Sequence, residues 1–221
     1  MEKDKPVKIA MVDDHVLIRD ALASIINESG GYQVTLLAKT GREFIEKLKG
    51  DDLPDLVILD LNMPEMDGFE TARWLYEHHP EIYILVLTMY DTELVLLRMI
   101  RYGTRGFLKK DIHPAELKNA IDMTVRTGYF YSDQLTGRLM SMLKSGDAEH
   151  FSLNNTILSD NEMNFLRLAS TEMTYKEISK MNTSARNVDN WRDALFTKLH
   201  VKSRVGLVLY AIKNGVIGPG W

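Results

Sequence analysis

The chain has 221 residues, 45% of them hydrophobic, which is enough for one large or two modest domains. It contains no cysteine, so disulfides and thiolate metal sites are excluded, and no apolar run approaches the length of a membrane span. We therefore expect a soluble, cytoplasmic protein with no membrane partner. The net charge of -4 is unevenly distributed, because residues 1–125 contain 15 Lys and Arg against 22 Asp and Glu, whereas residues 158–221 contain 9 against 6. This asymmetry fits a metal site in the first part and an anion-binding surface in the last.

Short apolar strands alternate with helical patterns through residues 1–127, which predicts a doubly wound α/β domain around a parallel five-stranded sheet. The predicted strands cover residues 8–12, 32–38, 56–59, 82–87 and 106–110. The predicted helices cover residues 16–26, 42–48, 69–76, 92–101 and 114–126. In an open parallel sheet, ligands bind at the carboxyl ends of the strands, so the residues at those ends are the first candidates for a site.

Polar residues stand at four of these strand ends. Asp13 and Asp14 follow the first strand, Asp60 the third and Thr88 the fourth, and Lys110 ends the fifth. Three carboxylates in one crevice would repel one another unless a cation lay between them, and hard oxygen ligands with room for water suit Mg2+. With a hydroxyl and an ammonium added, this set is what phosphoryl transfer to a carboxylate needs. The alternative for Asp13 and Asp14 is that they only cap the helix that follows.

A resemblance to the receiver domain of two-component response regulators rests on Asp13-Asp14, the stretch Asp60-Leu-Asn-Met-Pro-Glu-Met-Asp-Gly68, Thr88 and Gly106-Phe-Leu-Lys-Lys110. It implies the strand order 2-1-3-4-5 and a partner sensor histidine kinase that phosphorylates Asp60. It also implies a Mg2+ site formed by Asp13, Asp14, Asp60 and the backbone carbonyl of Asn62.

The same resemblance gives roles to further positions. Thr88 matches the switch hydroxyl, Lys110 the lysine that pairs with the phosphate, and Phe107 a switch aromatic that turns inward on phosphorylation. Phe107 could equally be an ordinary apolar residue of the fifth strand. Tyr90 and Asn62 match the residues that flank the path of the hydrolytic water. We hypothesise that the Tyr90 ring hinders water and prolongs the phosphorylated state, the alternative being a tyrosine with no kinetic role.

A connecting segment is predicted for residues 128–156, with a helix at 133–143 and then a polar, turn-rich linker at 144–155. Residues 157–221 change to an all-α pattern of four short helices. Ser159 with Glu162 and Thr174 with Glu177 each form a capping box, Ser184 can cap a third helix, and a fourth covers residues 205–213 before Asn214-Gly215. The tight junction at residues 181–184 predicts a helix-turn-helix unit.

Four motifs stand out in this last part: Leu-Ser-Asp-Asn-Glu, Tyr-Lys-Glu-Ile-Ser, Ser-Ala-Arg-Asn-Val-Asp-Asn-Trp-Arg and Lys-Leu-His-Val-Lys-Ser-Arg-Val. They resemble the LuxR-type DNA-binding domain of NarL/FixJ-like regulators, which implies that the helix starting near Ser184 enters the major groove of a double-stranded DNA operator. The candidate base or phosphate contacts are Ser184, Arg186, Asn187, Asp189, Asn190 and Arg192, and the candidate backbone contacts are Lys176, Lys198 and Lys202. Asp189 repels phosphate, so we expect any contact that it makes to be with cytosine.

Two departures from that family bear on the DNA contacts. The spacing between Ile178 and Val188 is one residue shorter than usual, so the second helix or the turn must be tightened. Asn187 also stands where the family commonly has Thr. Either change could alter how the recognition helix is presented to DNA.

The combined interpretation is a phosphorylation-dependent DNA-binding transcriptional regulator that accepts a phosphoryl group on Asp60 and is not an enzyme. We expect phosphorylation to promote a homodimer on an operator with two half-sites. One alternative is a phosphorylation-gated adaptor whose helical domain binds protein. Another is a Mg2+-dependent aspartyl-phosphate phosphatase, which needs an additional general acid, and the nearest candidate, Asn62, cannot donate a carboxyl proton.

Overall fold

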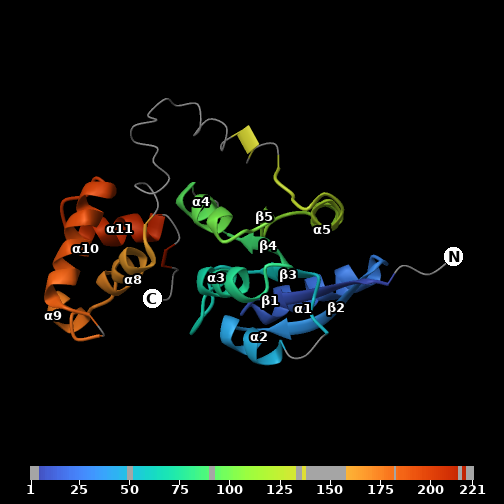
Figure 1. The fold of residues 1–221 in the computed structure, drawn as a ribbon. Coiled ribbons are helices and arrows are strands. Elements are labelled where there is room, and N and C mark those ends of the chain that lie inside the picture. Colours follow the sequence, from blue (N-terminus) through green and yellow to red (C-terminus); the bar gives the residue numbers. More distant parts are fainter. Residues whose placement is uncertain are drawn as a thin grey trace. The chain divides into compact units, whose positions relative to one another are not determined.

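The computed structural model describes residues 5–48, 52–89, 93–132, 136–137, 158–181, 183–213 and 216–217 (Figure 1). The chain forms two compact units, one built around a sheet and one built from helices. The predicted helix at 133–143 lies almost entirely outside the described residues, and the linker at 144–155, Tyr90 and the helix end at Asn214-Gly215 lie wholly outside them. The predicted domain boundaries therefore stay a prediction. No described helix is long and apolar enough to cross a membrane.

The first unit holds a five-stranded parallel sheet in the order β2-β1-β3-β4-β5, as predicted (Figure 1). Its strands are β1 (Val7–Val12), β2 (Tyr32–Ala38), β3 (Leu56–Leu59), β4 (Tyr83–Thr88) and β5 (Gly106–Lys109). Every residue of β3 is buried, and so are the last five of β4. Central strands of a parallel sheet are covered on both faces, which explains why these stretches are apolar throughout. The predicted strand ends differ from the observed ones by one residue at most.

Five helices flank the sheet: α1 (Val16–Glu28), α2 (Gly41–Lys47), α3 (Gly68–His78), α4 (Glu93–Arg101) and α5 (Pro114–Thr127). The helices α1 and α5 share one core cluster with Ile9 and Met11 of β1. Ala10 and Val12 are equally buried, and because side chains alternate along a strand, they face the opposite side of the sheet. The described helix ends lie within two residues of the predicted ones.

The loop between β3 and α3 is held in a compact form by backbone contacts. The Gly68 N–H donates to the Leu61 carbonyl at 3.1 Å, and Asp67 caps α3 in a capping box with Glu70. A Cβ atom on Gly68 would lie 2.2 Å from the Asp60 carbonyl oxygen. Glycine is therefore the residue that lets α3 begin directly beneath the end of β3.

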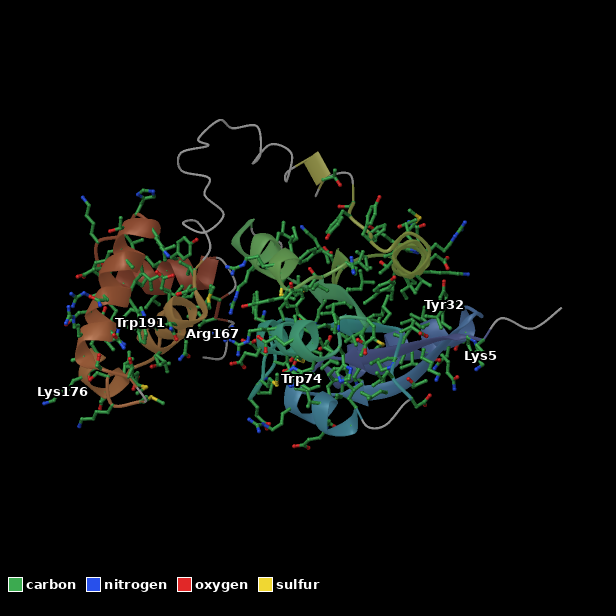
Figure 2. The ribbon with its side chains drawn as sticks, viewed as in Figure 1. Lys5, Tyr32, Trp74, Arg167, Lys176 and Trp191 are labelled. Carbon is green, nitrogen blue, oxygen red and sulfur yellow. The ribbon has the colours of Figure 1, made fainter. Side chains whose placement is uncertain are left out.

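The second unit is formed by α8 (Asp160–Ala169), α9 (Tyr175–Ile178), α10 (Ala185–Lys198) and α11 (Arg204–Lys213). The predicted caps are confirmed, because Ser159 and Thr174 form capping boxes and the Ser184 hydroxyl accepts a hydrogen bond from the Asn187 N–H. The α9 helix has only four residues, so the second helix of the predicted helix-turn-helix unit is a single turn. The buried residues of this unit form a cluster of their own, against which Trp191 packs (Figure 2).

One side of β5 is covered by the chain that leaves α5. Phe130 forms a parallel bridge with Gly106, and its N–H donates to the Arg105 carbonyl at 2.7 Å. The Tyr131 hydroxyl donates to the Thr104 carbonyl at 3.1 Å. A Cβ atom on Gly106 would lie 2.5 Å from the Phe130 carbonyl oxygen, so the close approach of this segment depends on that glycine.

Candidate functional site

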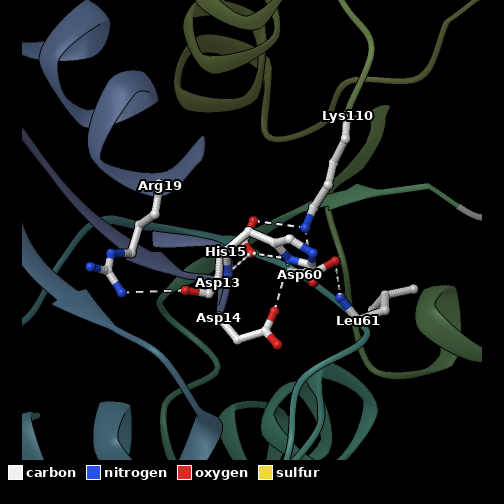
Figure 3. Close-up of polar contacts among 7 residues, drawn as sticks. All are labelled: Asp13, Asp14, His15, Arg19, Asp60, Leu61 and Lys110. Atoms are coloured by element: carbon white, nitrogen blue, oxygen red, sulfur yellow. Dashed lines mark hydrogen bonds and ion pairs between the residues drawn. The ribbon is translucent and has the colours of Figure 1, made fainter. Parts of the chain in front are cut away.

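Three carboxylates meet at the carboxyl edge of the sheet. The Asp60 N–H donates to the Val12 carbonyl at 2.9 Å, which brings Asp60 beside Asp13 and Asp14. Candidate ligand atoms of these three residues and of His15 all lie within 4.8 Å of one another (Figure 3). The structure thus groups the acids that the sequence predicted and adds His15. The sequence analysis missed this imidazole, although its place directly after two acids was a usable signal.

Lys110 reaches the same edge from the end of β5. Its Nζ lies 2.8 Å from Asp13 Oδ2 and 2.9 Å from Asp60 Oδ2, and its side chain is only 4% exposed (Figure 3). The predicted ammonium therefore contacts the predicted phosphoacceptor and one of the predicted metal ligands. Among the described residues, Lys110 faces three acids, whose negative charge exceeds the single positive charge of the lysine.

Burial shifts the protonation of these groups. It raises the pKa of Asp60 to about 6, and the Asp13 charge acts in the same direction, against the opposing effects of Lys110 and the Leu61 N–H. Burial by itself would lower the pKa of Lys110, but the Asp60 and Asp13 carboxylates outweigh it and hold that pKa above its ordinary value. The site therefore favours a charged lysine next to a carboxyl group whose pKa is higher than that of an ordinary aspartate.

The alternative that Asp13 and Asp14 merely cap α1 is wrong. The N-cap position of α1 belongs to His15, whose side chain makes no capping hydrogen bond. Instead Asp13 Oδ1 accepts a hydrogen bond from the His15 N–H at 2.8 Å. The two acids are consequently held at the edge of the sheet and not at the first turn of the helix.

This group of side chains fits a divalent cation. Asp14 Oδ1 is shielded from solvent and has no hydrogen-bond donor among the described residues, although His15 Nδ1 lies 2.9 Å away. Hard cations prefer oxygen ligands, and here carboxylate oxygens converge, among them one without a hydrogen bond from the described residues. The acidic edge is therefore a candidate metal site.

The remaining predicted residues of this site lie nearby along the strands. Thr88 is 2% exposed, and its carbonyl accepts a hydrogen bond from the Lys110 N–H at 3.1 Å. Phe107 is 6% exposed, and its ring stacks on that of Tyr131, with 6.3 Å between the ring centroids. Asn62 is partly buried in the loop after β3. Tyr90 lies outside the described residues, so its role stays a prediction.

In the second unit, α10 carries most of the predicted DNA contacts. Its buried residues are Val188 and Leu195, whereas Arg186, Asn187 and Asn190 are exposed. Ser184 is the N-cap of the helix, so its hydroxyl already accepts a backbone hydrogen bond. Asp189 and Arg192 are also on the surface, but they form an ion pair with each other.

The three predicted backbone-contacting lysines differ in their surroundings. Lys176 and Lys202 are exposed, and Lys176 extends away from the core of the unit (Figure 2). Lys198 Nζ instead lies 2.8 Å from the carboxylate of Glu162, which is buried in α8. Sequence analysis also missed Arg204, whose guanidinium donates to the carbonyls of Ala169 and Thr171 and so ties α11 to the end of α8.

Comparison with known families accounts for both units. A family model described as "Response regulator receiver domain" matches residues 9–122, and one described as "Bacterial regulatory proteins, luxR family" matches residues 156–211. The chain is 32% identical over 217 residues to the oxygen regulatory protein NreC of Staphylococcus haemolyticus (strain JCSC1435), and the match covers 96% of this chain and 99% of that protein.

Solved structures share the fold. RcsB from Salmonella enterica serovar Typhimurium, bound to promoter P1flhDC in the presence of phosphomimetic BeF3-, is 21% identical with a TM-score of 0.71, and the match covers 95% of this chain and 100% of that one. A structure of two RcsB dimers bound to two parallel DNAs is 22% identical with a TM-score of 0.66, covering 93% and 98%. These likenesses agree with the order of elements found in both units.

Proposed function

Because the chain belongs to the response regulators in which a receiver domain is joined to a LuxR-family regulatory domain, we propose that it is a phosphorylation-dependent DNA-binding transcription regulator of a two-component system. A sensor histidine kinase would phosphorylate Asp60, and the second unit would bind a double-stranded DNA operator in the cytoplasm. The observation that carries this proposal is the buried Asp60 carboxylate, placed between Asp13, Asp14 and Lys110 at the carboxyl edge of a parallel sheet.

For the acidic edge we propose Mg2+, held by Asp13, Asp14, Asp60 and the backbone carbonyl of Asn62. The bound ion would supply positive charge to the phosphoryl oxygens. An Asp60 oxygen would form a bond to the phosphorus of the kinase phosphohistidine, while the N–P bond breaks and the imidazole leaves with the electron pair. The pKa of about 6 leaves Asp60 largely ionised at neutral pH, as a nucleophile must be.

Lys110 and Thr88 are proposed to transmit the effect of Asp60 phosphorylation to the neighbouring strands. The Lys110 ammonium lies 2.9 Å from Asp60 Oδ2, so it is close enough to form an ion pair with a phosphoryl oxygen once Asp60 is phosphorylated. The Lys110 backbone N–H donates a hydrogen bond to the Thr88 carbonyl. This bond couples the lysine to the residue that carries the predicted switch hydroxyl. Phe107, on β5, is the aromatic side chain that we expect to repack on phosphorylation. Asp60 serves here as an acceptor of one phosphoryl group, and we propose no enzymatic turnover.

On the DNA side, the exposed residues of α10 and its neighbours support the proposed contacts. Arg186, Asn187 and Asn190 can reach base edges or phosphates, and Lys176 and Lys202 can reach the DNA backbone. Homodimerisation on two half-sites is proposed as the consequence of phosphorylation. An exposed apolar row on α11, formed by Val205, Leu209 and Ile212, supports contact with a second copy of the chain.

The test measures DNA binding by the purified full chain at fixed salt, using selection from random duplexes, with and without a small phosphodonor plus Mg2+. We expect the phosphodonor to enhance sequence-selective binding, and Asp60→Asn to abolish the enhancement. The matched control is Asp111→Asn, which removes an exposed carboxylate and should leave it intact.

Two outcomes would contradict the proposal in different ways. Phosphorylation without selective DNA binding in either state would favour the protein-binding adaptor and would point to the shortened helix-turn-helix junction as the reason. Sustained hydrolysis of a generic phosphate ester by the wild-type chain, lost in Asp60→Asn, would favour the phosphatase.

The lifetime of the phosphorylated state tests the proposed role of Tyr90. If a bulky ring hinders the hydrolytic water, Tyr90→Ala should shorten the lifetime of the Asp60 acyl phosphate, measured as loss of label from the phosphorylated chain. Tyr90→Phe keeps the ring and should preserve the lifetime. Equal lifetimes in all three proteins would mean that Tyr90 has no kinetic role.

A further inference from the structure

The outward face of α10 carries an acid that the sequence analysis did not consider. Val188 and Leu195 are buried, so residues on the opposite side of the helix face away from the unit. Arg186, Asn190 and Asp193 are spaced four and three residues apart on that side, and all three are exposed. Any DNA that contacts Arg186 and Asn190 must therefore also approach Asp193.

Arg192 is held against the helix by two carboxylates. Its Nη1 lies 2.9 Å from Asp189 Oδ1, and its Nε and Nη2 both lie 2.9 Å from Asp193 Oδ1. The Arg192 side chain is 30% exposed, whereas those of Asp189 and Asp193 are 57% and 67% exposed. The acids are thus the more accessible members of this cluster, and one guanidinium set against two carboxylates leaves a negative charge beside the recognition face.

We propose that Asp189 and Asp193 suppress sequence-independent binding, because they keep Arg192 from DNA phosphates and repel the DNA backbone, so that the domain binds weakly wherever base contacts are absent. The inference rests on the proposed DNA-binding function. Charge on the backbone is the same for every sequence, so a negative cluster lowers the affinity for target and non-target DNA alike. Selective contacts from Asn187, Asn190 and Arg186 can offset that loss only at the operator.

The test compares two kinds of DNA over a salt series. Binding of the full chain to a random-sequence duplex and to the duplex recovered by selection is measured for wild type, Asp189→Asn, Asp193→Asn and the double variant. We expect the double variant to bind the random duplex at least about tenfold more tightly, with the slope of log K against log salt steeper by about 1 as Arg192 gains a phosphate contact. The affinity for the operator should rise by a similar factor, because the backbone charge is the same in both duplexes.

Two controls separate this effect from a general change in charge or fold. Glu172→Gln removes an exposed carboxylate between α8 and α9, away from the α10 cluster, and should leave random-duplex binding nearly unchanged. Arg192→Gln should weaken binding to the random duplex in the wild-type background, where it leaves both carboxylates unneutralised, and should reverse most of the gain in the double variant. Circular dichroism of each variant verifies that the helices are retained.

The outcomes distinguish the inference from the function on which it rests. If the wild type selects an operator but the double variant binds random DNA no better than Glu172→Gln does, the inference is wrong and the function stands. If the wild type binds no DNA and the double variant gains binding to random DNA, the inference holds and the proposed function of the native chain fails. Absence of DNA binding in every protein overturns both.

Discussion

The buried carboxyl of Asp60 is held at a cost in stability when no cation is bound. Its pKa in the folded chain is about 6, mainly because of burial, whereas the ordinary value is 3.8. A raised pKa means that the folded state binds the proton more tightly than the unfolded state does. The associated stability is fully present below about pH 4 and is lost as the pH rises through about 6.

We therefore expect Asp60→Asn to stabilise the first unit in the presence of a chelator. One pKa unit corresponds to about 1.4 kcal/mol, so the free energy of unfolding should rise by about 1–3 kcal/mol at pH 7.5. The difference between variant and wild type should shrink at pH 5, where Asp60 is protonated. Hydrogen exchange of peptides from β1 and β3 measures it, with Asp111→Asn as the exposed control. A variant less stable than wild type at pH 7.5 would contradict this account of the site.

A second buried carboxylate, that of Glu162, has the opposite behaviour. Burial raises its pKa, but hydrogen bonds from Lys198 and Ser159 outweigh that effect, and the pKa lies below its ordinary value of 4.5. A lowered pKa contributes stability that is present above the ordinary value and is lost as the pH falls through the folded one. The Glu162–Lys198 pair should accordingly support the second unit at neutral pH and fail in acid.

Lys198→Met tests this pair and, at the same time, the predicted DNA contact of Lys198. The variant leaves Glu162 buried without its partner. We therefore expect the free energy of unfolding of the second unit to fall by about 1–3 kcal/mol at pH 7, and by less below pH 4. The exposed Lys202→Met is the control and should leave stability unchanged. Chemical unfolding measures the loss, and the salt dependence of DNA binding shows whether Lys198 also contacts phosphate. Unchanged stability would mean that the ion pair contributes nothing.

The connection from β3 to α3 depends on the absence of a side chain at Gly68. A Cβ atom there would meet backbone atoms of Asp60 and Leu61 at 2.2 and 2.7 Å, and backbone cannot yield as a flexible side chain would. We expect Gly68→Ala to destabilise the first unit by about 2–4 kcal/mol and to weaken Mg2+ binding, because the shift displaces Asp60. Gly137→Ala, where a Cβ atom would meet nothing within 4 Å, is the matched control. Calorimetry and metal titration give the two measurements.

The sequence predicted the order of strands and helices because apolar runs, glycines and capping residues act locally. It also predicted which strand ends carry Asp13, Asp60 and Lys110, since a parallel sheet gathers those ends at one edge. It could not predict the pairing of Lys198 with Glu162, which are 36 residues apart in the chain. Such contacts depend on how helices pack, and no periodicity in the sequence records that packing.

The two units have separate cores, with different buried clusters in the sheet unit and in the helical unit. We expect calorimetry of the full chain to show two unfolding transitions. Because a ligand stabilises only the state that binds it, Mg2+ should raise the transition temperature of the sheet unit and leave the other unchanged. Asp14→Asn, which removes one proposed ligand, should reduce that shift. An equal shift of both transition temperatures would mean that Mg2+ does not act through binding at the acidic edge.

The bridge between Phe130 and Gly106 also bears on self-association. An uncovered strand at the margin of a sheet offers unpaired N–H and C=O groups, onto which a strand from another molecule can add. The segment after α5 occupies part of that margin along β5, and it fits there only because residue 106 has no side chain. A larger residue at position 106 would push the segment away and open the edge. Such a protein could retain Asp60 and its neighbours and still be lost from solution by aggregation.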